Sequence, residues 1–200
     1  MRIDMQSLVR NVFIWAILSI AVAVPLYAAA TSPLLAWRQP VYIAAGFAGV
    51  IGMALLLFQP LLAIGLLPGI GLHRSRRVHR WSGILLVAAV VVHVAGLWVT
   101  SPPDVIDALL FVSATPFSNW GVVAMWSLFA AATLAVLRRR LHLRPKLWRV
   151  SHKTLAAIVV VGSVVHALLI DGTMQFASKV VLCVLVLVAA GLALIGLKGQ

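Results

Sequence analysis

The chain is 200 residues long, 63% apolar and 10% charged, with a mean hydropathy of +1.10. A soluble globular domain carries about 25% charged residues, so this composition excludes one and indicates an integral membrane protein. Lysine and arginine outnumber the acidic residues by 16 to 4, which gives a net charge of +12, and glutamate is absent. The absence of glutamate argues against a hydrolase with paired carboxylates. The single cysteine, Cys183, excludes an internal disulfide and a CxxC metal or redox site.

Six apolar runs are long enough to cross a bilayer, which requires a helix of about 20 residues. In chain order they cover residues 11–30, 41–67, 81–100, 119–137, 148–170 and 179–197. The stretch 105–112 is too short to span the bilayer and is expected to be an interfacial loop element. No internal repeat is evident. The sequence therefore predicts an all-α integral membrane protein with a single six-helix transmembrane domain over residues 1–200.

The first run, 11–30, also has features of a secretory signal. Arg2 and Arg10 precede the apolar stretch, and three small residues, Ala28, Ala29 and Ala30, end it. Its length of about 20 residues exceeds that of a signal core, for which about 7–15 residues is usual. We therefore expect a span that is retained in the mature protein.

The positive charges separate by side of the predicted bundle. One side holds 14 of the 16 lysines and arginines, at the chain ends and in the loops after the second and fourth runs: Arg2, Arg10, Arg74, Arg76, Arg77, Arg80, Arg138, Arg139, Arg140, Arg144, Lys146, Arg149, Lys153 and Lys198. The other side holds Arg38 and Lys179 with Asp104, Asp107 and Asp171. Because cytoplasmic loops carry the excess of lysine and arginine, we expect a multi-pass protein of the cell inner membrane with both termini cytoplasmic. Topology then explains the basic charge, so the expected partner is membrane lipid and not nucleic acid.

Four of the six histidines form a pattern. His79 and His93 belong to the third span and His152 and His166 to the fifth, and each pair is separated by 14 residues. On an α-helix, 14 residues advance about 21 Å and turn to within roughly 40° of four whole turns. Both rings of a pair therefore lie on one face at two depths. The two spans run in the same direction, which places His79 level with His152 near the cytoplasm and His93 level with His166 nearer the outer surface.

Each level of histidines offers a metal ion two imidazole ligands. No cysteine or carboxylate lies nearby to complete a tetrahedral site. A haem supplies its own four equatorial nitrogens and takes one axial ligand from each side. Since a polar ring inside the membrane is costly without a function or a partner, the quartet predicts two haems stacked across the bilayer, a path for electrons. For any single histidine, an interhelical hydrogen bond is the alternative.

Other residues are assigned by their position in the predicted bundle. Gly96 and Gly162, alongside the histidine faces, would leave room for a macrocycle or allow close helix packing. Basic residues beside the inner level are candidates for contacts to haem propionates, in addition to their topological role: Arg77, Arg80, Arg149 and Lys153. His73 and His142 lie in basic loops and are expected to be solvated. Trp148, near a predicted interface, is expected to be a belt residue. No catalytic triad is visible.

Three segments around the histidines resemble one protein family. They are RVHRW at 77–81, TPF at 115–117 and LWRVSH at 147–152, with the first and last continuing to His93 and His166. The sequence is similar, over about residues 41–198, to the ferric reductase-like transmembrane family, which includes ferric-chelate reductases, NADPH oxidases and the haem subunit of the periplasmic methionine sulfoxide reductase system. The resemblance implies a six-helix bundle with two b-type haems that moves electrons from a cytoplasmic flavin or quinol to an outside acceptor. It also implies that His79 and His152 hold the inner haem, and His93 and His166 the outer one.

The sequence differs in one respect from each of two branches of this family. Ferric reductases and NADPH oxidases carry a C-terminal flavin and nicotinamide domain, which this sequence lacks, so we expect an oxidoreductase component supplied by a separate cytoplasmic reductase or by quinol. A dedicated haem subunit of a periplasmic methionine sulfoxide reductase system is an alternative, although its inner level typically lacks a histidine at the position of His79.

In a different class, the same histidines could serve a cofactor-free proton channel or an assembly factor, because an imidazole can titrate near neutral pH.

Overall fold

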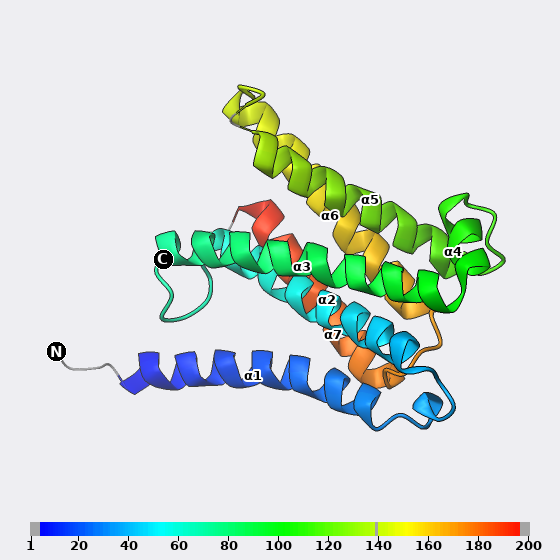
Figure 1. The fold of residues 1–200 in the computed structure, drawn as a ribbon. Helices are drawn as coiled ribbons and strands as arrows, with labels where there is room; N and C mark the ends of the chain where they lie inside the picture. The colour runs from blue at the N-terminus through cyan, green and yellow to red at the C-terminus, as the bar shows by residue number, and fades with distance from the viewer. Residues whose placement is uncertain (1–4, 139, 197–200) are drawn as a thin grey trace.

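The computed structural model describes residues 5–138 and 140–196. Over these residues the chain is helical: α1 (Met5–Ala30), η1 (Pro33–Leu35), α2 (Pro40–Ile64), α3 (Leu72–Thr100), α4 (Pro102–Leu109), α5 (Pro116–Leu137), α6 (Pro145–Leu169) and α7 (Phe176–Ile195) (Figure 1). In this described part, six helices are long and apolar enough to cross a membrane, namely all the α-helices except α4. The predicted all-α, multi-pass membrane protein with six spans is therefore confirmed.

Every spanning helix begins before its predicted run, by one residue at α2, three residues at α5, α6 and α7, six at α1 and nine at α3, and two of the differing boundaries have a clear local cause. α3 begins at Leu72 and not at residue 81, so His73 lies in its first turn and not in a loop. The basic segment continues the helix because arginine is a good helix former whose long side chain can keep its charge in the headgroup region. α2 ends at Ile64 and not at residue 67. Gly65 adopts a left-handed φ of 72° there and donates its backbone N–H to the last carbonyls of the helix.

The segment predicted as an interfacial loop, 105–112, overlaps the eight-residue helix α4, which begins three residues earlier. Pro102 occupies its first turn, where proline's fixed φ suits a helix and its missing N–H costs nothing. Asp104, in the same turn, accepts a hydrogen bond from Ser101 Oγ and opposes the positive end of the helix dipole. The element is too short to span, as predicted, but its prolines begin a helix and do not prevent one.

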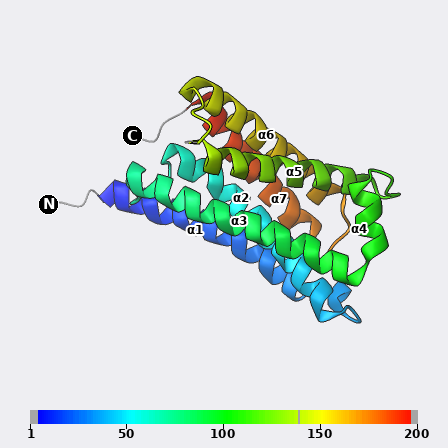
Figure 2. The same ribbon diagram turned by 45° about the horizontal axis from the view of Figure 1, so that its top comes forward.

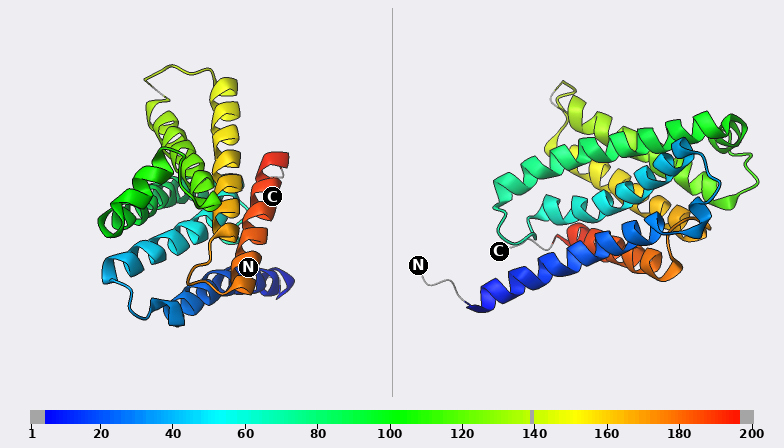
Figure 3. Two further views of the ribbon diagram at one scale, coloured as in Figure 1. Left: turned by 90° about the vertical axis from the view of Figure 1, so that its right-hand side faces the viewer. Right: turned by 60° about the horizontal axis from the view of Figure 1, so that its bottom comes forward.

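The long helices form two hairpins that are joined through α7. α2 packs along α3, and α5 packs along α6, while α7 contacts both α2 and α6 (Figure 2). The shared core lies where these elements meet, and in α7 it includes Leu182 and Val186, which are 1% and 0% exposed. α1 lies at the edge of the bundle, against α7 and α2 (Figure 3). The two hairpins place α3 and α6, which carry the four histidines, on facing sides.

Gly96 and Gly162 serve helix packing within the hairpins. A Cβ atom added to Gly96 would lie 2.7 Å from Cβ of Ala45 in α2, and one added to Gly162 would lie 3.0 Å from Cβ of Ala124 in α5. Both distances are too short for carbon atoms in contact, so each glycine allows its helix to approach the partner helix closely. Of the two roles considered for these glycines, the structure supports packing.

Lys179 lies on the side predicted to face outward, and it is 4% exposed. Its Nζ donates a hydrogen bond to the carbonyl of Ile170 at 2.8 Å and lies 3.5 Å from that of Leu168, at the C-terminal end of α6. The last carbonyls of a helix lack partners within it and form the negative end of its dipole. The Lys179 ammonium therefore caps α6, which explains a lysine on the side that is otherwise poor in positive charge.

Replacing Lys179 by methionine is expected to lower the free energy of unfolding by about 1–3 kcal/mol, because the carbonyls at the end of α6 lose a buried donor. Denaturant unfolding in detergent, followed by tryptophan fluorescence, measures this change. The control is Lys146→Met near the other end of α6, where the side chain is exposed, and its expected effect is within about 0.5 kcal/mol. Equal effects of the two substitutions would contradict the capping role.

Candidate functional site

The two pairs of histidines meet between α3 and α6. The ring centroids of His93 and His166 are 6.4 Å apart, with their planes at 83°. His79 and His152 lie close enough to interact electrostatically. All four rings are partly buried. The structure therefore brings together the residues that the sequence pairs by depth, called here the inner level (His79 and His152) and the outer level (His93 and His166). Their role as ligands stays a prediction.

The spacing at the outer level suits one metal ion between two imidazoles. A bond from an imidazole nitrogen to such a metal is about 2 Å and the nitrogen lies about 1 Å from its ring centre, so ligands on opposite sides place the ring centres about 6 Å apart. The observed 6.4 Å agrees with this. Among the described residues, no group of three or more His, Cys, Asp or Glu surrounds a common point. The donor set therefore fits a metal that brings its other ligands with it, as haem iron does.

Three of the four imidazoles are fixed by main-chain carbonyls of the neighbouring helix. The Nδ1–H of His93 donates to the carbonyl of Ala45 at 2.7 Å, and that of His166 donates to the carbonyl of Phe117 at 2.8 Å. At the inner level, Nδ1–H of His79 donates to the carbonyl of Gln59 at 3.1 Å. Because a carbonyl can only accept, these bonds place the proton on Nδ1 and leave Nε2 as the nitrogen available to a metal.

Two glycines make room for the outer imidazoles. A Cβ atom on Gly49 would lie 3.0 Å from Nδ1 of His93, and one on Gly121 would lie 2.8 Å from Nδ1 of His166. Neither glycine was singled out from the sequence. The sequence alone carries no signal for them, because their positions are defined relative to carbonyl partners that only the structure shows. Each glycine lies four residues, about one helical turn, after the residue whose carbonyl accepts from the histidine: Gly49 follows Ala45, and Gly121 follows Phe117.

The same arrangement occurs in both hairpins, although no repeat was evident in the sequence. In α2, the carbonyls of Ala45 and Gln59 receive His93 and His79 and are 14 residues apart, the spacing of the histidines themselves. In α5, Phe117 receives His166, and Ala131, again 14 residues away, is the backbone group that interacts with His152. The α5–α6 hairpin therefore repeats the layout of the α2–α3 hairpin, with a carbonyl hydrogen bond at His166 and only a backbone contact at His152. The corresponding positions in α2 and α5 are backbone carbonyls. Every residue has one, so the correspondence cannot be seen as a repeat of residue types in the sequence.

Comparison with known families places the chain in one of them. The family described as ferric reductase like transmembrane component matches residues 45–163, more than half of the chain. The chain belongs to this family. The matched region begins at Ala45, the first of the carbonyl partners, and includes both inner histidines and His93, while His166 lies just beyond it. No curated protein and no solved structure matched the chain in the corresponding comparisons. Membership of the family indicates transmembrane electron transfer.

One of the four histidines of this family member is held differently. Within the described part of the chain, Nδ1 of His152 is buried without a hydrogen-bond partner, so its contact with Ala131 is not an anchoring bond. The ring of His152 instead stacks on that of Trp148, with centroids 5.4 Å apart and planes within 10°. The guanidinium of Arg138 also lies over the Trp148 ring, 4.3 Å from its centroid. Sequence reasoning placed Trp148 at the membrane interface and did not connect it with His152, although the four-residue spacing puts both on one helix face.

The basic residues expected beside the inner level are exposed in this family member. Arg77 and Arg80 lie on α3 near His79, and Arg149 and Lys153 lie on α6 near His152. Lys153 Nζ donates to the carbonyl of Ala193 in α7, at 3.4 Å. The other members of the predicted basic side lie at the same end of the bundle, except that Arg2, Arg139 and Lys198 fall outside the described residues.

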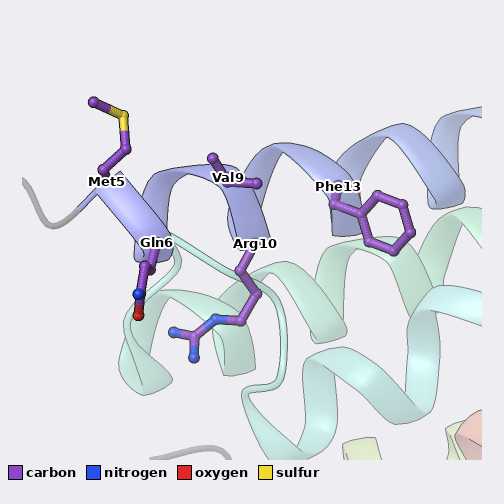
Figure 4. A pocket seen from close by; sticks show the side chains of 5 residues that line it. All are labelled: Met5, Gln6, Val9, Arg10 and Phe13. Carbon is purple, nitrogen blue, oxygen red and sulfur yellow. The ribbon is translucent and has the colours of Figure 1, made fainter.

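Two shallow apolar hollows on the described surface do not belong to the site. One follows the first turns of α1 and is lined by Met5, Gln6, Val9, Arg10 and Phe13 (Figure 4). The other lies between α5 and α6 and is lined by residues that include Trp120, Thr154 and Gly162. Neither hollow includes a histidine, so the histidine pairs remain the candidate site.

Proposed function

We propose that this family member carries single electrons across the membrane through two b-type haems. His79 and His152 would be the axial ligands of the inner haem, and His93 and His166 those of the outer one. The observation that carries the proposal is the outer level, where two imidazoles stand 6.4 Å apart and each is anchored through Nδ1 to a carbonyl of the adjacent helix. Such an anchor fixes the ring orientation and raises the basicity of the ligand nitrogen.

The packing around α3 supports a group of haem size between the hairpins. α3 is the least covered of the six spans, with 6% of its apolar window buried, compared with 28% for α6. Between the two levels, Leu86 of α3 and Val159 of α6 are each 5% exposed, so aliphatic side chains separate the levels and exclude water. A bound haem supplies a reversible one-electron iron couple. The chain's own contribution is to hold four imidazoles in register and to keep their surroundings dry.

In this proposal electrons move outward. The inner level lies at the basic end of the bundle, where Arg77, Arg80, Arg149 and Lys153 would complement haem propionates. By the positive-inside rule this end faces the cytoplasm, with both termini, in a cell inner membrane. The donor would be a separate cytoplasmic reductase or quinol, and the acceptor would lie in the periplasm. Residues 1–200 would act as one haem-binding transmembrane domain.

The inner level favours a ferric reductase-like role over that of a methionine sulfoxide reductase haem subunit. His79 is anchored on Gln59 as His93 is anchored on Ala45, so Nε2 of His79 is left available in the same way, which supports an axial role for it. The side-chain amide of Gln59 also donates to Ser82 Oγ at 2.9 Å, which ties α2 to α3 one turn from His79. A complete quartet of histidines is the pattern expected of the ferric reductase branch.

The deciding experiment is an optical spectrum of the purified protein from haem-replete cells, oxidised and then reduced with dithionite, together with a pyridine haemochrome assay. We expect a Soret band, a reduced α band and about two haems per chain. The double variant His73→Ala/His142→Ala, which alters only exposed histidines, is expected to keep both haems. Absence of these bands would overturn the proposal, and proton flux in proteoliposomes would then test the cofactor-free channel.

A further inference from the structure

The stack of Arg138, Trp148 and His152 joins the loop after α5 to the inner level. Arg138 follows the last residue of α5, and Trp148 and His152 lie one turn apart in α6. Within the described residues, neither Trp148 Nε1 nor His152 Nδ1 has a hydrogen-bond partner, although both atoms are buried. Besides a backbone contact with Ala131 that is not a hydrogen bond, the His152 ring is held by ring contacts, at 5.4 Å between the two rings and 4.3 Å from the guanidinium to the Trp148 centroid.

Stacking and hydrogen bonding constrain an imidazole differently. The carbonyl bonds of the other three histidines fix the tautomer and raise the basicity of the free nitrogen, whereas a stack fixes only the plane of the ring. Arginine over indole adds a cation–π contact that is stronger where water is excluded. The pairing suits arginine in particular, because the planar guanidinium can stack on the ring while its N–H groups remain available to other partners.

We infer that Trp148, clamped by Arg138, is the positioning residue of His152 and replaces the carbonyl anchor that the other three histidines have. The inference rests on the proposed function, in which His152 is an axial ligand. It makes the inner level the site with the less basic and more readily displaced ligand. It also connects this ligand to Arg138, at the end of α5, so that a displacement of the Arg138 guanidinium from the Trp148 ring alters the inner level and leaves the outer level unchanged.

The test compares Trp148→Leu with Trp148→Phe, using Trp126→Leu as the matched control. Trp126 is 57% exposed on α5 and contacts Phe129, away from the histidines. Electron paramagnetic resonance of the oxidised protein reports the relative orientation of two axial imidazoles, and a soluble haem-scavenging protein reports haem retention. In Trp148→Leu we expect a changed signal from the inner level and about 10–100-fold faster loss of one haem. Trp148→Phe should restore both properties, because a phenyl ring can still stack.

Several outcomes would be decisive. Two haems in the parent protein with unchanged signals and retention in Trp148→Leu would overturn the inference and leave the proposed function intact. Lack of haem in the parent protein would overturn the proposed function. If Trp148→Leu does not fold, Arg138→Leu supplies the same test from the other side of the stack, and Arg138→Lys, which keeps the charge without the planar group, should give a partial change. Equal effects on both levels would indicate a general structural role and count against the inference.

Discussion

Replacing His93 or His166 by alanine is expected to remove the outer haem and to leave the inner haem in place. Each outer imidazole would supply one of only two protein ligands at its level, and among the described residues no other His, Cys, Asp or Glu clusters there as a substitute. Haem content should therefore fall by about half, from about two per chain to about one. The remaining haem should titrate as a single component in a potentiometric experiment.

Electron transfer across the membrane should fall to background in the same variants, because the inner haem alone cannot deliver electrons to the outer surface. Proteoliposomes with a reductant on one side and an impermeant acceptor on the other measure this rate. His79→Ala and His152→Ala should give the complementary result, with the outer haem retained. Loss of one and the same haem in all four variants would refute the two-level arrangement. His73→Ala, in the exposed first turn of α3, is the control.

The substitution Gly121→Ala is expected to disturb the outer level although it replaces neither of the proposed haem ligands. The added methyl group would lie 2.8 Å from Nδ1 of His166, which must move and thereby weaken its bond to the Phe117 carbonyl. Retention of the outer haem should weaken by about 10–100-fold, as is usual when a partner of a metal ligand is lost. Overpacking should also lower the free energy of unfolding by about 1–3 kcal/mol. Gly49→Ala should act in the same direction on His93, with a smaller effect at its 3.0 Å contact.

A glycine in open space provides the control for this substitution. A Cβ atom on Gly46, in the same helix as Gly49, would meet nothing within 4 Å. Gly46→Ala should therefore keep both haems and leave the protein as stable as before or more stable by about 0.5–1 kcal/mol, since alanine is the better helix former. If Gly121→Ala retained the outer haem normally and left its electron paramagnetic resonance signal unchanged, the close approach of α5 to the His166 ring would not be needed to hold that haem.

Periodicity and charge were enough to predict the number of spans and the pairing of the histidines. Six long apolar runs correspond to six helices, and the 14-residue spacing brings His93 to His166 and His79 to His152. These features were predictable because helix geometry turns a residue count into a direction and a depth. The start of α3 at Leu72 was missed because an apolar-run criterion ends a helix at the first arginines, whereas the backbone does not.

Contacts between helices were the part that sequence could not supply. Gly96 and Gly162 were considered as haem lining or packing residues, and only the positions of Ala45 and Ala124 decide for packing. The anchors of the histidines are backbone carbonyls, and every residue has one, so no residue type marks Ala45 or Phe117 as special. The stack on Trp148 was hidden for another reason, since a tryptophan near an interface already has a sufficient explanation there.

The two equivalent hairpins have a consequence for assembly. Each hairpin brings one imidazole to each level, so neither α2–α3 nor α5–α6 contains both of the proposed ligands of a level. The site exists only after the two hairpins have met, in the way that a site at a dimer interface exists only in the dimer. A ligand that binds this joined state stabilises it by mass action. If the proposed haems bind there, the supply of haem during membrane insertion would determine how firmly the two halves of the bundle are held together.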